Sequence, residues 1–251
     1  MTSFDALLAE GEAVPVDGWD FSWFEGRATE ERPAWGYASL LPSRIAAATA
    51  VLDVQTGGGE VLAEALAAAP RKPLTVTATE AWPPNVALAR AALAGFGAVV
   101  EETDGLPFPD ESFDLVISRH PVDTDWPEIA RILKPGGMYL SQQVGTGTMH
   151  ELTDAMMGPQ PVGDSRDPAR HAEWAKAAGL TVVDLRSAAL RTEFLDVAAV
   201  VVYLRKVVWI VPGFTVAAYR DRLRSLPIPF VAWSRRFLIE ARKPESRDEE
   251  Q

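Results

Sequence analysis

The chain has 251 residues, of which 47% are hydrophobic and 24% charged. This composition is typical of a folded globular protein and too apolar for a disordered one. The formal net charge of −11 gives the surface a field that repels phosphate backbones, so it argues against nucleic acid as the main substrate. Cysteine is absent, which excludes disulfides, thiolate metal ligands and cysteine nucleophiles.

The sequence gives no sign of export or membrane insertion. Its first residues are acidic rather than basic, so we expect no signal peptide. The longest apolar run, 197–210, is interrupted by Arg205 and Lys206 and is too short to cross a bilayer of ~30 Å. We therefore expect a cytoplasmic protein with no membrane span, present as a monomer or a homodimer.

From residue 50 onward, short β-rich runs alternate with helical runs. The predicted strands are 50–54, 74–79, 98–101, 113–118, 138–144, 180–185 and 236–241. The predicted helices are 60–69, 83–95, 126–133, 167–178, 194–208 and 216–226. Gly95 is expected to cap its helix, and 134–137 to form a turn. Alternation of this kind predicts an α/β fold, with a Rossmann-like, doubly wound and mostly parallel sheet between helices.

The domain organisation follows from where this pattern starts and loosens. Residues 1–45 are rich in aromatic side chains and are interpreted as an N-terminal lid or arm. The α/β domain is expected over 46–242, with a small helical cap inserted at about 190–228, because that connection is longer than usual. Residues 243–251 are expected to form a flexible tail.

A glycine-rich turn follows the first predicted strand, in the sequence VLDVQTGGGEVLAEAL. Such a turn lets a ligand approach the backbone at the edge where open α/β sheets bind their ligands. A tight connection with no ligand is the alternative. The dinucleotide fingerprint requires a small residue where Leu62 stands, which disfavours NAD. The absence of a Tyr-x-x-x-Lys pair also argues against an NAD-dependent oxidoreductase.

Acidic residues end the first two predicted strands, at Asp53 and Glu80. S-adenosylmethionine suits such a site, because it carries a sulfonium, an ammonium group and a ribose diol and has no phosphate. The Glu80 carboxylate can accept hydrogen bonds from both ribose hydroxyls. Glu80 can instead be an acidic residue that stabilises the start of the helix at Pro83.

Four segments in order, AVLDVQTGGGE, TATEAW, GLPFPDESFDLVISRH and RILKPGGMYL, resemble the signature segments of class I S-adenosylmethionine-dependent methyltransferases that act on small molecules. The resemblance spans 50–144. It implies a seven-stranded sheet of order 3-2-1-4-5-7-6 whose last strand is antiparallel, and RRFLIEARK would supply that strand. It further implies that Phe108 and Phe113 belong to the core.

The resemblance also implies the cofactor site. The methionine end lies at Asp53 and the glycine turn, the ribose at Glu80, the adenine at Asp104 and the backbone after it, and the transferred methyl near Ser118 to His120. The implied cofactor-binding residues are Asp53, Gln55, Thr56, Gly57, Gly59, Glu80, Ala81, Asp104, Gly105, Leu106, Ser118 and Arg119.

One residue departs from the family's D-x-G-x-G-x-G pattern, because Gln55 stands at the first glycine. We expect Gln55 to be accommodated, since Gly57 and Gly59 remain. A catalytically silent module that binds the cofactor and regulates a partner stays open as an alternative. Methylation of RNA or protein also stays open, although a basic tract and the N-P-P-[YF] signature are missing.

Methyl transfer requires no metal or covalent nucleophile, because the sulfonium activates the methyl, and alignment can supply ~7–11 kcal/mol. A hydroxyl acceptor would benefit from a base, for which histidine is suited. His120 and His150 follow predicted strand ends and are the candidate catalytic residues, although each can be purely structural. His171 is expected on an outward helix. Asp123 and Asp125 can serve as bases but are interpreted as caps of the helix that begins at Trp126.

The sequence WDFSWFEGRATEERPAWGY precedes the first predicted strand and is dense in aromatic residues. Its aromatic residues are Trp19, Phe21, Trp23, Phe24, Trp35 and Tyr37. They can close a lid over a flat substrate or a sulfonium, or dock as an arm on the core. A later set, Trp209, Phe214 and Tyr219, can form the opposite wall of the site, but simple core packing is the favoured interpretation.

Overall fold

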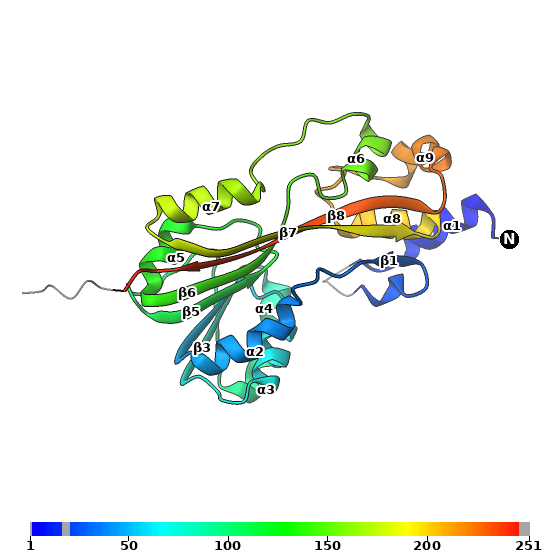
Figure 1. Cartoon of the computed structure of the whole chain (residues 1–251). Coiled ribbons are helices and arrows are strands. Elements are labelled where there is room, and N and C mark those ends of the chain that lie inside the picture. Colours follow the sequence, from blue (N-terminus) through cyan, green and yellow to red (C-terminus); the bar gives the residue numbers. More distant parts are fainter. Residues whose placement is uncertain (1, 17–20, 246–251) are drawn as a thin grey trace, which may run out of the picture. The chain divides into compact units, whose positions relative to one another are not determined.

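A computed structural model describes residues 2–16 and 21–245 of the chain (Figure 1). The chain divides into two compact units. Unit 1 comprises Met1–Pro33, Gly145–Asp164 and Ala188–Arg235, and unit 2 comprises Ala34–Val144, Ser165–Ser187 and Arg236–Gln251. This division rests on compactness, so the expected functional division into lid, domain, cap and tail stays a prediction. Trp19 and most of the expected tail lie outside the described residues.

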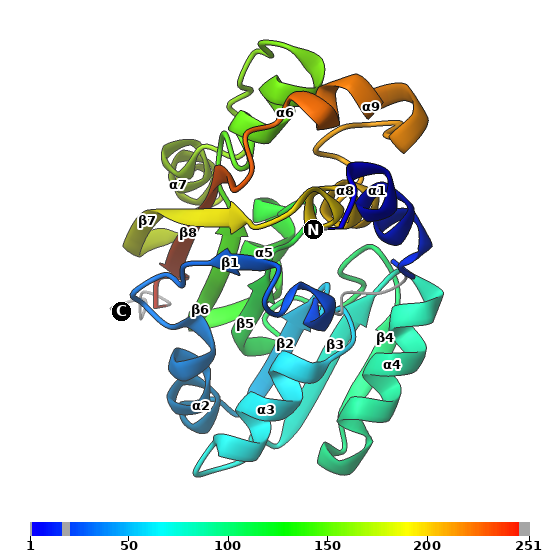
Figure 2. The same cartoon turned by 90° about the vertical axis from the view of Figure 1, so that its right-hand side faces the viewer.

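Unit 2 holds the sheet and the helices that cover it. Its elements are α2 (Tyr37–Ala47), β2 (Ala50–Val54), α3 (Glu60–Ala68), β3 (Thr75–Glu80), α4 (Pro83–Leu93), η2 (Ala94–Phe96), β4 (Val99–Glu102), β5 (Phe113–Arg119), α5 (Trp126–Ile132), β6 (Leu133–Val144) and α7 (Pro168–Ala177). The strands β7 (Thr181–Phe194) and β8 (Phe230–Arg242) contribute residues to both units. Helices α2, α3 and α4 cover one face of the sheet, and α5 and α7 cover the other (Figures 1 and 2).

The predicted fold class is confirmed. The strands follow the order β7-β8-β6-β5-β2-β3-β4, which is the predicted order of the seven strands. Neighbours from β4 to β6 pair in parallel, and β8 pairs antiparallel with β6, as expected of the last strand. Within the described residues the sheet has eight strands rather than seven. The additional strand, β1 (Ala28–Glu30), pairs antiparallel with the end of β7 and is only 3 residues long.

The core of unit 2 explains why these segments form these elements. β2 is buried along its whole length, as an inner strand covered on both faces must be. One apolar cluster of buried residues includes Leu52, Phe113, Val116, Ile129 and Phe237. Phe108 is partly buried against the same cluster, so the core positions expected for both phenylalanines are confirmed.

The outward position expected for His171 is wrong. The side chain is 6% exposed and its ring lies 6.0 Å from Trp126, 5.1 Å from Trp174 and 5.1 Å from Phe237. Its Nε2 forms a hydrogen bond of 3.1 Å with the Ser165 carbonyl. Burial lowers the pKa of His171, because the charged imidazolium would lose its hydration among these rings.

Several predicted element ends also differ from the structure. Gly95 does not end its helix; a 3₁₀ turn follows α4, and Gly97, at φ 67°, supplies the left-handed residue. The expected turn at 134–137 is part of β6, where a register shift opposite Phe113 and Leu115 accommodates Gly136 at φ 74°. The sixth and last strands extend to 14 and 13 residues, beyond their predicted ends.

Unit 1 is built from helices and the remaining strand segments. Its elements are α1 (Phe4–Ala13), η1 (Ser22–Phe24), β1, α6 (His150–Met157), α8 (Val197–Lys206) and α9 (Val216–Ser225). The helix predicted from residue 194 begins at Val197, since the Asp196 side chain caps it by accepting from the Ala199 amide at 2.8 Å. Gly11 allows α1 to approach α8 closely, because a Cβ there would lie 2.9 Å from Val201. Among the described helices, none has the length and hydropathy needed to span a membrane.

Candidate functional site

The turn after β2 accommodates Gln55 in the left-handed region, at φ 57°. A side chain is disfavoured there, but two hydrogen bonds hold this one. Gln55 Nε2 donates to the Asp123 carbonyl at 3.1 Å, and the Val122 amide donates to Gln55 Oε1 at 2.7 Å. The residue that replaces the family's first glycine therefore ties the turn to the loop that follows β5.

Glycine is required at positions 57 and 59 of the turn for two different physical reasons. Gly57 adopts φ 64°, and a Cβ there would meet nothing within 4 Å. Gly59 adopts φ 79°, and a Cβ there would lie 3.1 Å from Ala89 Cα and 3.2 Å from Leu93 Cγ of α4. Gly59 therefore serves the packing of α3 on α4, whereas Gly57 leaves an open backbone face for a ligand.

The Glu80 carboxylate faces this turn. Its Oε2 accepts from the Gly57 amide at 2.9 Å, and its Oε1 accepts from the Trp82 amide at 2.9 Å. The residue is 9% exposed. A carboxylate has about four acceptor positions, so each oxygen keeps capacity for a further donor from a ligand. Ala81, between Glu80 and Trp82, is exposed.

Asp53 is a buried carboxylate at the end of β2, 6% exposed. Burial raises its pKa to about 7; the hydrogen bond from Thr56 opposes this rise, and the nearby Glu60 and Glu80 add to it. The Thr56 hydroxyl donates to Asp53 Oδ2 at 2.7 Å. Three acidic side chains near one another make this part of the turn favourable for a cationic ligand.

The loop after β4 is organised by Arg131 of α5. Its guanidinium donates to the Leu106 carbonyl at 3.0 Å and to the Phe108 carbonyl at 2.7 Å. Asp104 and Gly105 are exposed, and Leu106 is half-buried. The loop expected to recognise adenine therefore has a fixed backbone with an exposed carboxylate.

The end of β5 rests on a buried network of hydroxyl groups. Ser118 is 0% exposed, and its hydroxyl lies 2.9 Å from both the Tyr139 hydroxyl and the Ser141 hydroxyl. The Tyr37 hydroxyl donates to the Ser118 carbonyl at 3.0 Å. The side chain of Ser118 is thus held inside the protein, while the next residue, Arg119, is exposed.

His120 follows in a left-handed conformation, at φ 54°, and its ring is held by Gln142. Trp35 Nε1 donates to Gln142 Oε1 at 2.8 Å, and Gln142 Nε2 lies 3.0 Å from His120 Nε2. Because an indole N–H can only donate, the Gln142 oxygen is the acceptor and its NH₂ group is the donor. His120 Nε2 must then accept, which places the imidazole proton on Nδ1.

The charge state of His120 agrees with this tautomer. Burial lowers the pKa of His120 well below its ordinary value, and the charges of Arg236 and Arg119 lower it further. The imidazole is therefore neutral near pH 7, with one lone pair occupied by Gln142. His120 offers a hydrogen-bond donor at Nδ1 in this arrangement rather than a free base.

His150 lies in unit 1, at the first position of α6. Its Nε2 is 3.3 Å from Asp154 Oδ2, one turn further along the same helix. Asp125 caps α5 as predicted, since its side chain accepts from the Glu128 amide at 3.1 Å. Asp123 contributes its carbonyl to Gln55 instead.

The aromatic stretch before β2 divides between the units. Trp35 and Tyr37 are 9% and 4% exposed and hydrogen-bonded in unit 2, so these two dock on the core. Phe21 and Trp23 contact Phe24 in unit 1, with ring centroids 5.8 and 5.6 Å apart. A lid formed by this stretch stays a prediction.

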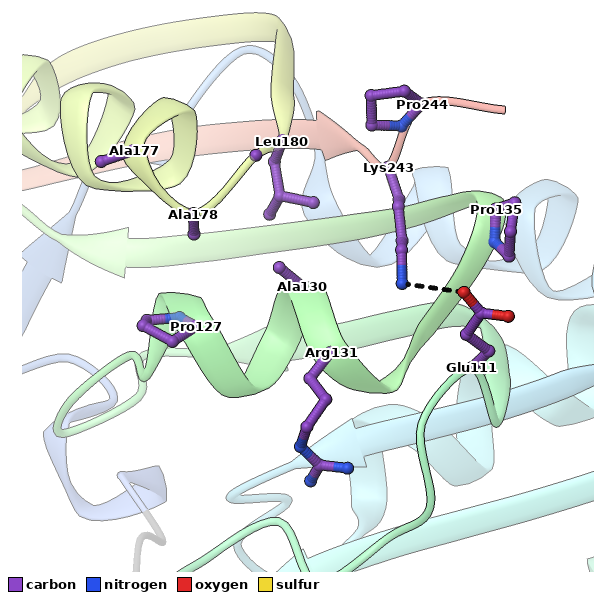
Figure 3. Close-up of a pocket in the computed structure, with 11 residues that line it drawn as sticks. Glu111, Pro127, Ala130, Arg131, Pro135, Ala177, Ala178, Leu180, Lys243 and Pro244 are labelled. Atoms are coloured by element: carbon purple, nitrogen blue, oxygen red, sulfur yellow. Dashed lines mark hydrogen bonds and ion pairs between the residues drawn. The ribbon is translucent and has the colours of Figure 1, made fainter. Parts of the chain in front are cut away.

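A groove of about 650 Å³ lies elsewhere in unit 2, where β6 begins and β8 ends (Figure 3). It is lined by Glu111, Pro127, Ala130, Arg131, Pro135, Ala177, Ala178, Gly179, Leu180, Lys243 and Pro244. This is the amino-terminal edge of the parallel strands, opposite to the edge formed by Asp53, Glu80 and Ser118. Except for Arg131, which supports the loop at Leu106, none of these residues belongs to the site described above.

Residues 52–141 match the protein family described as Methyltransferase domain. The chain contains a class I methyltransferase domain. Membership of this family implies the use of S-adenosylmethionine. The matched residues include the glycine turn, Glu80, the loop held by Arg131 and the end of β5, so the family match and the geometry fall on the same elements.

Solved structures share the fold of this methyltransferase. A candidate methyltransferase from Bacillus halodurans aligns with a TM-score of 0.58 and 20% identity, over 82% of this chain and 98% of the other. A second, the candidate methyltransferase solved in complex with the Trm112 methyltransferase activator of Haloferax volcanii, aligns with a TM-score of 0.53 and 20% identity over 98% of both chains. An S-adenosylmethionine-dependent methyltransferase from Mesorhizobium loti aligns with a TM-score of 0.50 and 16% identity, over 83% and 97%. None of the curated proteins matches the chain.

The sequence did not point to two residues that shape the methyltransferase site, Arg131 and Gln142. Gln142 could have been found, because it lies near the end of a predicted strand at the same edge as Ser118. Arg131 carries no such signal, because it acts on the backbone of a distant segment. The cofactor and catalytic roles of the residues named from the sequence stay predictions.

Proposed function

We propose that this methyltransferase transfers a methyl group from S-adenosylmethionine to a small-molecule acceptor at the carboxyl edge of β2, β3 and β5. The observation that carries the proposal is the Glu80 carboxylate, which bonds the Gly57 amide at 2.9 Å beside the buried Asp53. A pyrophosphate would be repelled by these acids, whereas a sulfonium with an ammonium group is attracted to them.

The residues present fit this cofactor. When bound, S-adenosylmethionine supplies a methyl group that its sulfonium has already activated. The Glu80 oxygens have acceptor capacity for the ribose hydroxyls, and Asp53 would pair with the cationic methionine end. The open face at Gly57 lets that end approach the backbone. The loop from Asp104 to Leu106, held by Arg131, would bind the adenine.

A small acceptor is supported by the net charge of −11, which disfavours RNA. The tautomer of His120 favours a role in binding the acceptor rather than in removing its proton. His150 stays the other candidate base for a hydroxyl acceptor. The product would be S-adenosylhomocysteine.

Calorimetric titration of the purified protein with S-adenosylmethionine and S-adenosylhomocysteine tests the proposal. We expect saturable binding of both, and formation of S-adenosylhomocysteine with at least one small acceptor. Neither heat nor a thermal shift at about 1 mM ligand would refute it. Binding without turnover across a broad acceptor panel would support the silent regulatory module instead.

A further inference from the structure

The outer edge of β7 is open along most of its length. The sheet order places β7 between β8 and β1, but β1 pairs only with Thr192–Phe194 at the end of β7. Among the described residues, no strand pairs with the outer edge of 181–190. An open edge presents unpaired backbone N–H and C=O groups to which another strand can bind. The first residues of this edge, 181–187, belong to unit 2.

The backbone groups of alternate residues face this open edge. At the paired end of the strand, the Leu195 amide donates to the Arg27 carbonyl at 2.8 Å, and the Arg191 carbonyl accepts from the Glu31 amide at 3.0 Å. Odd-numbered residues therefore turn their N–H and C=O groups outward there. Because these directions alternate along a strand, the odd-numbered residues of 181–189 also present their backbone groups to the open edge.

The same stretch has an uncovered side-chain face. Every odd-numbered residue from 181 to 189 is exposed, including Val183 at 51% and Leu185 at 39%. Val182, on the opposite face, packs against the core cluster of unit 2. Proteins commonly protect open edges with proline or lysine, and 181–189 contains neither. This strand is therefore suited to pairing with another strand.

The charges along the edge decide which strand fits it. Asp184 and Arg186 are the only charged residues of 181–189, and their side chains form an ion pair of 2.6 Å. An antiparallel partner strand must place a positive residue opposite Asp184 and a negative residue opposite Arg186. A second copy of the same strand does so when the two-fold axis passes through Leu185, because Asp184 then lies opposite Arg186 of the other copy.

This register also satisfies the backbone. The axis must pass through an odd-numbered residue, because only then do outward groups meet outward groups. An axis two residues earlier or later would place Asp184 and Arg186 opposite apolar side chains. With the axis at Leu185, each charge has an opposite charge across the strands, at a Cβ separation of about 4.5–5.5 Å. The two exposed leucines then face each other.

We propose that the protein forms a homodimer through antiparallel pairing of β7 with β7 of a second copy, centred on Leu185. The pairing joins the two sheets and removes the open edge of each copy. Two equivalent contacts between Asp184 and Arg186, together with the leucine pair, stabilise it. The dimer requires neither cofactor nor acceptor, so it is independent of the proposed function.

Sedimentation velocity between about 1 μM and about 1 mM protein measures the dimer. We expect a dimer fraction that rises with concentration. Arg186→Asp and Asp184→Arg each place like charges opposite one another twice, and each should raise the Kd of the dimer about tenfold or more. The double variant restores opposite charges and should return the Kd to within about threefold of wild type.

Arg90→Asp is the matched control for these variants. It reverses a charge on α4 whose side chain is 55% exposed and ion-paired with Glu102, compared with 53% for Arg186. Its net charge changes as much as that of Arg186→Asp, but α4 packs on β3 and β4 at the other end of the sheet order. The control should keep the wild-type Kd.

Amide hydrogen exchange, resolved by residue, tests the register without any variant. In the dimer, the Leu185 amide donates to the Leu185 carbonyl of the other copy, and the outward amides of Val183 and Ser187 are bonded in the same way. Exchange of these three amides should slow at least about tenfold from dilute to concentrated protein. The amides of Asp184 and Arg186, which face β8, should keep their rates.

A protein that stays monomeric up to about 1 mM would overturn the inference. A dimer in which the Leu185 amide keeps its exchange rate would also overturn it, because that dimer uses another surface. So would a double variant that dimerises as weakly as Arg186→Asp, since the charges would then not lie opposite each other.

Discussion

Replacing Asp53 with asparagine should make the free protein more stable, and increasingly so as the pH rises. Burial raises the pKa of this carboxyl from 3.8 to about 7, so the folded protein holds a proton that the unfolded chain has lost. Between these two values the folded state binds more protons, and stability falls as the pH rises. At about 1.4 kcal/mol per pH unit, ionising Asp53 above pH 7 costs the fold about 4 kcal/mol.

Asparagine removes this cost, because it is neutral and can still accept the 2.7 Å hydrogen bond from Thr56. The stability gained by Asp53→Asn should be about 2 kcal/mol near pH 5.5 and about 4 kcal/mol near pH 8. Urea unfolding of both proteins at these two pH values, without ligand, measures the difference. The same variant should bind S-adenosylmethionine more weakly, because the cation loses its carboxylate.

The reasoning would be refuted if Asp53→Asn gave no gain in stability, or a gain that shrinks from pH 5.5 to pH 8. Such a result would mean that Asp53 ionises in the folded protein as easily as in the unfolded chain. Glu60→Gln is a useful comparison. It removes a neighbouring charge that contributes to the raised pKa while leaving the buried group in place. It should reproduce only a small part of the effect.

Three further predictions concern single residues. Glu80→Ala should weaken S-adenosylmethionine binding at least about 100-fold by calorimetry, through loss of two charge-assisted hydrogen bonds of ~1.5–3 kcal/mol each. Glu101→Ala, on the exposed side of β4, should not weaken it, and equal affinities in Glu80→Ala and wild type would remove the ribose assignment. Gln55→Gly should relieve the backbone strain of the positive φ at residue 55 but release the loop at 122–123, because the Val122 amide loses its acceptor. Hydrogen exchange of the Val122 amide should become faster, while the affinity for the cofactor changes less than about tenfold; an unchanged exchange rate would contradict this prediction. His171→Ala should lower the free energy of unfolding by about 3 kcal/mol in urea titrations, because it leaves a cavity among three aromatic rings. A loss below about 1 kcal/mol would contradict the role of His171 in packing unit 2.

Most strands of the sheet could be predicted because they are short and apolar and lie near glycine or proline, whereas their order came from the resemblance to the methyltransferase family. Such segments form inner strands with little influence from distant residues. β1 escaped detection because a strand of 3 residues has no measurable alternation. Its pairing with the end of β7 depends on residues more than 160 positions away.

The cofactor turn could be predicted from local chemistry, but the support of His120 could not. Trp35 and Gln142 are 107 positions apart, and Tyr37 and Ser118 are 81 apart. Which polar side chains meet inside a protein depends on the assembled fold rather than on local spacing. The same reason explains His171, whose burial is decided by rings from α5 and β8.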